Sequence, residues 1–173
     1  MPWDAMIDYN FMNRCTQNFM TIWRCSKPVI ARINGDAVAG GSDIALCCDI
    51  TIMNEKARIG YPPARVWGCP TTAMWVYRLG LEKAKYMLFT GDLIKGRKAE
   101  EMGLIHQAVP LKELDQTVRV LTERIKGVPK NQLMMMKMTV NQAYENMGLA
   151  SSQTIATLFD GIARHSPEGV QFK

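Results

Sequence analysis

The sequence predicts an α/β fold in which a small layer of strands and helices is followed by an all-helical half. The chain has 173 residues, 47% of them hydrophobic, which is the length of one domain with enough apolar residues for a sizeable core. Short β-rich runs alternate with helical patterns in the first part, and helical spacing dominates the second. We therefore expect an α/β core over residues 1–110 and a helical, oligomerising part over residues 111–173.

The α/β part begins with a helix and a strand. Residues 4–24 carry methionine and aromatic side chains close to helical spacing, which predicts an amphipathic helix. Such a stripe is far more often core than a ligand-binding surface. Lys27-Pro28 interrupts the pattern, because the residue before a proline is driven out of the helical region. Residues 28–33 then form a short apolar run that predicts a buried strand.

A glycine-bearing loop follows this strand. Asn34-Gly35 ends the strand, and Gly40-Gly41 stands where the next helix opens, with Ser42 expected as the N-cap. Turn and helix-boundary signals at Pro110, Pro129 and Gly148 separate the later elements. The remaining strands are expected over residues 49–53, 57–61 and 104–109, and the remaining helices over residues 42–48, 71–79, 82–89, 97–102, 111–126, 130–147 and 149–164.

Charge, cysteine spacing and hydropathy argue against a nucleic-acid-binding, a zinc-binding or a membrane protein. Lys and Arg outnumber Asp and Glu by 21 to 16, and the net charge of +5 suits an anionic ligand, but no basic stripe or recognition motif for nucleic acid accompanies it. The five cysteines show no zinc-ligand spacing, and the adjacent pair Cys47-Cys48 favours free thiols. Neither a signal peptide nor an apolar run of membrane-spanning length is recognisable. We expect a cytoplasmic protein without a metal, a nucleic-acid partner or a membrane contact.

The glycine pair is the candidate active site. Helix starts leave backbone N–H groups unpaired, and glycines let a substrate carbonyl approach them closely, so the N–H of Gly40 can serve as half of an oxyanion hole. Gly41 is its neighbour in the motif, and Asp43 would face the same space as an acid or base. The simpler interpretations are a tight turn for the glycines and a charge favourably placed near a helix N-terminus for Asp43.

A proline-rich segment over residues 62–70 supplies further candidates. Its prolines fix φ and bracket an Arg-x-Trp pair, Arg65 and Trp67. Arg65 is suited to hold a phosphate or a carboxylate, although a solvated arginine on a loop explains it equally well.

Several motifs together resemble the crotonase (enoyl-CoA hydratase/isomerase) superfamily. They are Lys27-Pro28-Val29-Ile30-Ala31, Asn34-Gly35, Gly40-Gly41, Cys48-Asp49-Ile50, the stretch from Gly60 to Gly68, Leu88-Phe89-Thr90-Gly91, Ala99-Glu100 and Gly103-Leu104. The resemblance covers nearly the whole chain and the C-terminal two-thirds of a typical member. It implies a crotonase-like (ClpP/crotonase) core that is truncated at its N-terminus.

The resemblance also implies a function. An acyl-CoA thioester would bind with its carbonyl oxygen at the Gly40 N–H, beside Gly41, Pro63, Arg65 and Trp67 as substrate-binding residues. No separate cofactor is implied, because coenzyme A is part of the substrate. Members of the family usually assemble as homo-trimers or hexamers.

Two positions depart from the family pattern. Hydratases of the family use two glutamates, and this sequence has Asp43 and Pro63 at the matching positions. Aspartate can still transfer a proton, but proline cannot, so efficient hydration is not expected. The alternatives are another reaction of the family, such as thioester hydrolysis or C–C cleavage, and a non-catalytic crotonase-like fragment that keeps the fold and its assembly surfaces.

Overall fold

The computed structural model describes residues 2–65 and 68–171, and these residues form two three-stranded sheets. The first sheet has the order β1-β3-β6 and is parallel throughout. The second has the order β2-β4-β5, with β4 parallel to β2 and antiparallel to β5. The strands are β1 (Ile30–Ile33), β2 (Ala37–Val38), β3 (Ile50–Asn54), β4 (Arg58–Gly60), β5 (Leu93–Lys95) and β6 (Gln107–Val109).

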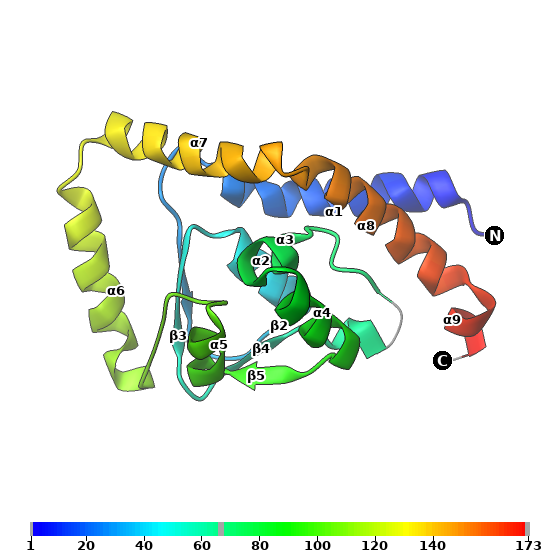
Figure 1. Cartoon of the computed structure of the whole chain (residues 1–173), viewed down its shortest axis with the longest axis horizontal. Coiled ribbons are helices and arrows are strands. Elements are labelled where there is room, and N and C mark those ends of the chain that lie inside the picture. The colour runs from blue at the N-terminus through cyan, green and yellow to red at the C-terminus, as the bar shows by residue number, and fades with distance from the viewer. Residues whose placement is uncertain (1, 66–67, 172–173) are drawn as a thin grey trace.

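The long helices lie on one side and at one end of the molecule. Helices α1, α7 and α8 lie side by side along the top of Figure 1 and α6 stands at its left end, whereas the short helices α2 to α5 lie below them, beside the strands (Figure 1). The helices are α1 (Ala5–Arg24), α2 (Gly40–Cys47), α3 (Met74–Leu79), α4 (Leu81–Thr90), α5 (Gly96–Met102), α6 (Leu111–Lys126), α7 (Lys130–Asn146), α8 (Leu149–His165) and α9 (Pro167–Gln171), with one 3-10 turn, η1 (Pro62–Arg65).

Helix α1 forms where the apolar spacing predicts it. The Asp4 side chain caps it by accepting hydrogen bonds from the N–H groups of Met6 and Ile7, at 2.9 and 3.0 Å. On its inner face Met20 and Trp23 are buried in the main core. That core also contains the fully buried side chains Leu46, Met53, Ile59, Met74, Trp75 and Met87, so it joins α1 to both sheets and to the short helices.

The start of α2 differs from the prediction. The helix begins at Gly40 rather than Ser42, and its N-cap is Ala39, so Ser42 is not the N-cap. The Ser42 hydroxyl instead donates a hydrogen bond back to the Ala39 carbonyl at 2.6 Å. The prediction places both glycines before the helix, but a serine inside the first turn can bond to a preceding carbonyl as readily as it can cap a helix.

Other helix and strand boundaries also differ from those predicted. The helix expected from residue 71 begins at Met74, because Thr71 and Thr72 are drawn into side-chain hydrogen bonds with distant segments. The strand expected from residue 104 begins at Gln107. Strands β2 and β5 and helix α9 were not expected; the two strands are only two and three residues long and pair with β4.

Helix α7 contacts the rest of the molecule through hydrogen bonds and through Tyr144, which packs against the main core. None of its residues is buried, and Met134, Met135, Met136 and Met138 are exposed. Lys137 Nζ donates to the carbonyls of Ile22 and Lys27 and pairs with Asp49 Oδ2 at 2.8 Å. Two further side chains reach main-chain carbonyls: Asn141 bonds to Trp23, and Tyr144 bonds to Tyr77.

No helix in residues 2–65 and 68–171 is both long enough and apolar enough to span a bilayer.

Candidate functional site

Backbone N–H groups at the start of α2 form the first part of the site. The N–H groups of Ser42 and Asp43 donate to the Ala39 carbonyl, at 2.9 and 3.1 Å. Gly40 and Gly41 are the first two helical residues, so their N–H groups precede any intrahelical acceptor. These two donors, at the positive end of the helix, can bind a negatively charged or polarised oxygen.

The space at the Cβ positions of these two glycines is open. A Cβ atom built on Gly41 would meet no heavy atom within 4 Å, and one built on Gly40 would meet only Phe19 Cζ at 3.7 Å, an ordinary contact. Neither glycine has a positive φ. Packing and backbone conformation therefore do not require glycine here, in contrast to Gly60, where a Cβ would collide with the carbonyl of Asp92. With glycine at both positions, no Cβ covers the surface at the start of α2.

Backbone strain is concentrated at the same place. Of the described residues, only Ala39 and Ala73 combine a side chain with a positive φ, at 51° and 57°. Ala39 immediately precedes α2, and Ala73 immediately precedes α3. Such conformations are costly for alanine and tend to occur at functional sites, where the surrounding structure maintains them.

Asp43 and Thr72 join these two helix starts. Asp43 is 3% exposed and Thr72 is fully buried, and the Thr72 hydroxyl lies 2.7 Å from Asp43 Oδ1. Burial raises the pKa of Asp43 to about 6; the Thr72 hydrogen bond opposes this shift and the nearby charge of Asp160 adds to it. A carboxyl group with a pKa near 6 has the property that a general acid or base needs near neutral pH.

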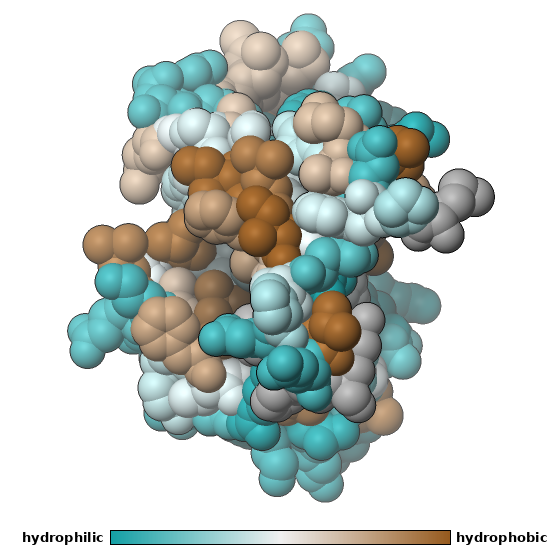
Figure 2. Space-filling view, turned by 90° about the vertical axis from the view of Figure 1, so that its right-hand side faces the viewer, coloured by the Kyte–Doolittle hydropathy of each residue, from teal (hydrophilic) through white to brown (hydrophobic). Residues whose placement is uncertain are grey.

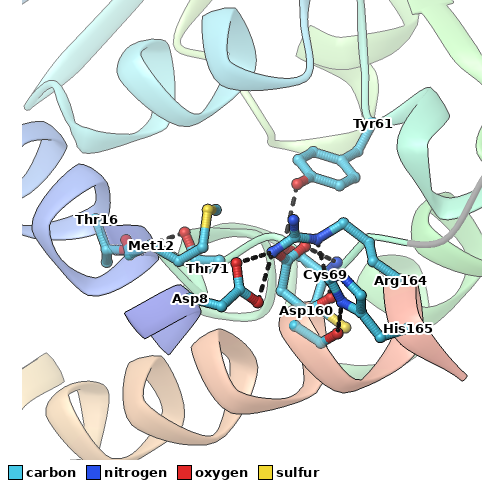
Figure 3. Close-up of polar contacts among 10 residues, drawn as sticks. Asp8, Met12, Thr16, Tyr61, Cys69, Thr71, Asp160, Arg164 and His165 are labelled. Atoms are coloured by element: carbon cyan, nitrogen blue, oxygen red, sulfur yellow. Dashed lines mark hydrogen bonds and ion pairs between the residues drawn. The ribbon is translucent and has the colours of Figure 1, made fainter. Parts of the chain in front are cut away.

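Residues of α1 and α8, together with Tyr61 after β4, hold the segment before Ala73. Asp160 of α8 accepts a hydrogen bond from the Cys69 N–H at 3.0 Å, and the Tyr61 hydroxyl donates to the Cys69 carbonyl at 3.1 Å (Figure 3). Arg164 pairs with Asp160 at 2.9 Å and with Asp8 of α1 at 3.1 Å. Burial, together with the charges of Asp43 and Asp160, raises the pKa of Tyr61 well above its usual range, so Tyr61 stays a hydrogen-bond donor.

The residues of the proline-rich segment are placed differently from the glycine site. Pro63 lies in η1. The Arg65 side chain pairs with Asp92 at 2.8 Å and donates to the Thr90 carbonyl, at the end of α4. Trp67 lies outside the described residues. The structure thus brings Gly40, Gly41 and Asp43 together and engages Arg65 with Asp92.

Sequence reasoning missed Thr72, Tyr61 and Asp160. Each is remote from Asp43 in the chain, and only the fold brings them near it. The sequence carries one signal for Asp160, because Gln153, Thr157 and Asp160 are polar residues at helical spacing. They lie on the same face of α8, and all three are buried. Polar residues repeated on a buried helix face require partners, and here Asp160 and Gln153 find theirs in the segment from Cys69 to Thr72.

Comparisons with known proteins give a consistent result. Residues 6–172 match the family model described as Enoyl-CoA hydratase/isomerase. A mitochondrial enoyl-CoA hydratase of Pongo abelii is 31% identical over 147 residues, which are 81% of this chain and 51% of that protein. A short-chain-enoyl-CoA hydratase of Clostridium acetobutylicum is 32% identical over 122 residues, 69% of this chain and 47% of that protein.

Solved structures agree with the sequence matches. The crystal structure of an enoyl-CoA hydratase from Mycobacterium smegmatis superposes with a TM-score of 0.94 at 48% identity, covering 99% of this chain and 59% of that one. The chain spans between 42% and 59% of the length of the curated relatives given by these matches.

Proposed function

This chain belongs to the enoyl-CoA hydratase/isomerase family, and we propose that it binds an acyl-CoA thioester at the start of α2. The thioester oxygen accepts a hydrogen bond from the Gly40 N–H, and Asp43 transfers the proton. The net charge of +5 favours a ligand that carries phosphates. Gly41 leaves room for the thioester to approach.

The observation that carries this proposal is the open space at two glycines that the fold does not need. A donor that points at developing negative charge stabilises an oxyanion or an enolate, and the loss of one such donor typically costs on the order of 100-fold or more in rate. Asp43 lies one turn further along the same helix, buried and with a pKa of about 6. An oxyanion donor and a proton-transfer group on one short helix suit chemistry at a thioester carbonyl or at the carbon next to it.

The reaction we propose needs a single proton-transfer group. Water addition to a conjugated double bond requires a base for the water and an acid for the α-carbon. Pro63, at the position that matches the second glutamate of the family's hydratases, supplies neither. Thioester hydrolysis and C–C cleavage fit the remaining groups better than efficient hydration does. Arg65 is engaged by Asp92, so the proposal gives it no part in the chemistry.

The Gly41→Ala variant tests the site. Alanine has room at this position and is the better helix former, so the variant should fold as well as the wild type. Its methyl group fills the space beside the N–H donors, and we expect turnover of acyl-CoA to fall on the order of 100-fold. Release of free coenzyme A from acetyl-, butyryl- and crotonyl-CoA measures turnover, and thermal shift with the same compounds measures binding.

Gly35→Ala is the matched control, since a Cβ at Gly35 also meets no atom within 4 Å but lies outside the helix start. Equal turnover in Gly41→Ala and the wild type would refute the assigned site. Stabilisation of the wild type by acyl-CoA without any turnover would favour the non-catalytic alternative, in which the chain binds the thioester and does not transform it.

A further inference from the structure

The hydrogen bond between Thr72 and Asp43 has a defined direction. The Thr72 hydroxyl carries one proton, and its oxygen has two neighbours: Asp43 Oδ1 at 2.7 Å and the Met74 N–H at 3.5 Å. A backbone N–H can only donate. The Thr72 oxygen therefore accepts from Met74, at the first turn of α3, and its own proton is given to Asp43 Oδ1.

The second carboxylate oxygen of Asp43, Oδ2, is not used in the hydrogen bond with Thr72. Among the described residues, Asp43 Oδ2 has no hydrogen-bond partner. The unpaired side-chain atoms that are completely buried there are Trp75 Nε1 and Thr157 Oγ1, so Oδ2 is unpaired but not completely buried. Asp43 keeps 3% of its surface exposed. Because Oδ1 already accepts the Thr72 proton, a proton held by Asp43 belongs on Oδ2.

We propose that Thr72 is a positioning residue that reserves Asp43 Oδ1 as an acceptor and makes Oδ2 the oxygen that takes up and releases the proton. This inference rests on the proposed role of Asp43 as the proton-transfer group. It adds the reacting atom and the residue that selects it. The step is balanced: the proton that leaves the substrate forms an O–H bond at Oδ2, and the Thr72 proton stays where it is.

Contacts on both sides of Thr72 keep its hydroxyl in place. Gln153 of α8 donates to the Thr72 carbonyl at 3.0 Å, and Asp160, seven residues further on the same helix, holds the Cys69 N–H. The Thr71 hydroxyl is 2.6 Å from the hydroxyl of Thr16 in α1. With these anchors, the segment from Cys69 to Thr72 cannot turn the hydroxyl away from Asp43 without breaking buried hydrogen bonds.

Three ionisable groups act on Asp43 or respond to its charge. Asp160 on α8 is a like charge and disfavours ionisation of Asp43. Tyr61, after β4, and Cys47, on α2, both have raised pKa values, caused by burial and then by the charge of Asp43, so both are neutral near pH 7. Against burial and Asp160, Thr72 is the group that favours the ionised form of Asp43.

The test compares Thr72→Val with Thr72→Ser. The Asp43 carboxyl is titrated by ¹³C NMR in protein labelled at aspartate carboxyl carbons, with Asp43→Asn assigning the signal. Valine has the same shape but donates no proton, so Asp43 should titrate about one pH unit higher than in the wild type. Serine keeps the donor and should restore the wild-type titration. An unchanged or lower titration point in Thr72→Val would overturn the proposal.

Thr71→Val is the matched control: it removes a buried hydroxyl one residue away that contacts Thr16 and not Asp43. Its titration should equal that of the wild type, and an equal shift in this variant would show a general structural effect instead. If Thr72→Val does not fold, Gln153→Met releases the Thr72 carbonyl and should shift Asp43 in the same direction by less; no shift there would refute the positioning role. No substrate is used, so failure of acyl-CoA binding leaves the outcome of this test unaffected.

Discussion

Burial and the nearby Asp160 disfavour the ionised form of Asp43. We therefore expect the folding stability of the chain to fall as the pH rises and Asp43 ionises. Its pKa is raised from 3.8 to about 6 in the folded chain. Below about pH 4 Asp43 is protonated in both the folded and the unfolded chain, so its shifted pKa does not lower the folding stability. As the pH rises toward about 6 the unfolded chain releases its proton first, and folding stability is lost.

Asp43→Asn should therefore stabilise the protein at pH 8 and not at pH 4. The expected gain in the free energy of unfolding at pH 8 is up to about 3 kcal/mol, and the asparagine oxygen still accepts from Thr72. Urea unfolding at the two pH values measures it. Asp36→Asn is the control of opposite sign, because the exposed Asp36 pairs with Arg58 and its pKa is lowered. A gain for Asp43→Asn that is equal at both pH values would contradict the assigned shift.

Pro63 is one of the two residues, with Asp43, that the family resemblance places at glutamate positions of the hydratases, and it is the one that cannot transfer a proton. If the missing acid limits hydration, Pro63→Glu should raise the rate with crotonyl-CoA by roughly 10²-fold or more, the usual worth of a positioned acid or base. The assay follows loss of the conjugated double bond in the ultraviolet. A wild-type rate that is already high and unchanged in the variant would show that hydration proceeds without a group at this position.

At the scale of elements, an ion pair that is largely shielded from solvent is one of the contacts that join α7 to the rest of the molecule. Lys137 and Asp49 have side chains that are only 8% and 18% exposed, and Lys137 also bonds to two carbonyls at the end of α1 and before β1. Lys137→Met leaves Asp49 buried without its cation and should lower the free energy of unfolding by about 3 kcal/mol. Chemical denaturation measures the change.

Lys126→Met is the comparison for that variant. Lys126 pairs with Glu123 on the surface of α6, with both side chains more than half exposed, so its loss should change the free energy of unfolding by less than about 0.5 kcal/mol. Similar effects of the two substitutions would mean that the Lys137 pair contributes no more than a surface pair does.

The long helices could be predicted from the sequence because their signals are local. The apolar spacing of α1, and the boundaries at Pro110, Pro129 and Gly148, place α1, α6, α7 and α8 within one residue of their observed bounds. The α/β class and the helical C-terminal half are confirmed, and the solved relatives share the crotonase-type fold. Strands β2 and β5 could not be predicted, because strands of two or three residues exist only through pairing with β4.

The site could be predicted only in part, for the same reason. Gly40, Gly41 and Asp43 are contiguous in the chain, so one motif reveals them. Thr72 and Asp160 reach Asp43 from residues 29 and 117 positions later, which no local pattern connects. The assigned roles of Gly40, Gly41, Pro63, Arg65 and Trp67 in substrate binding or catalysis remain predictions.

At the scale of the whole molecule, many large hydrophobic side chains are exposed on the surface of the single chain. Hydrophobic side chains reach the surface on the face where the beginning of α1 and the end of α8 lie (Figure 2). Exposed residues of α7 and α8 include Met134, Met138, Leu158, Phe159 and Ile162. Large exposed apolar patches usually mark contacts between subunits, and we expect a homo-oligomer, a trimer or a hexamer. Light scattering at micromolar concentration should give a multiple of the single-chain mass, and a clean monomer would be incompatible with it.

Because the methionines differ in exposure, their rates of oxidation can report whether the chain is folded. Four of the 13 lie exposed on α7, whereas Met20, Met53, Met74 and Met87 are fully buried. Peroxide converts accessible thioethers to sulfoxides and spares those inside a packed core. In the folded chain the α7 peptide should therefore gain oxygen atoms rapidly at Met135 and Met136, which are not among the residues expected at subunit contacts, while the peptides around the core keep their original masses. Any condition that oxidises the second set as fast as the first has opened the whole domain, and peptide mass spectrometry would detect this without a dye, a label or an activity assay.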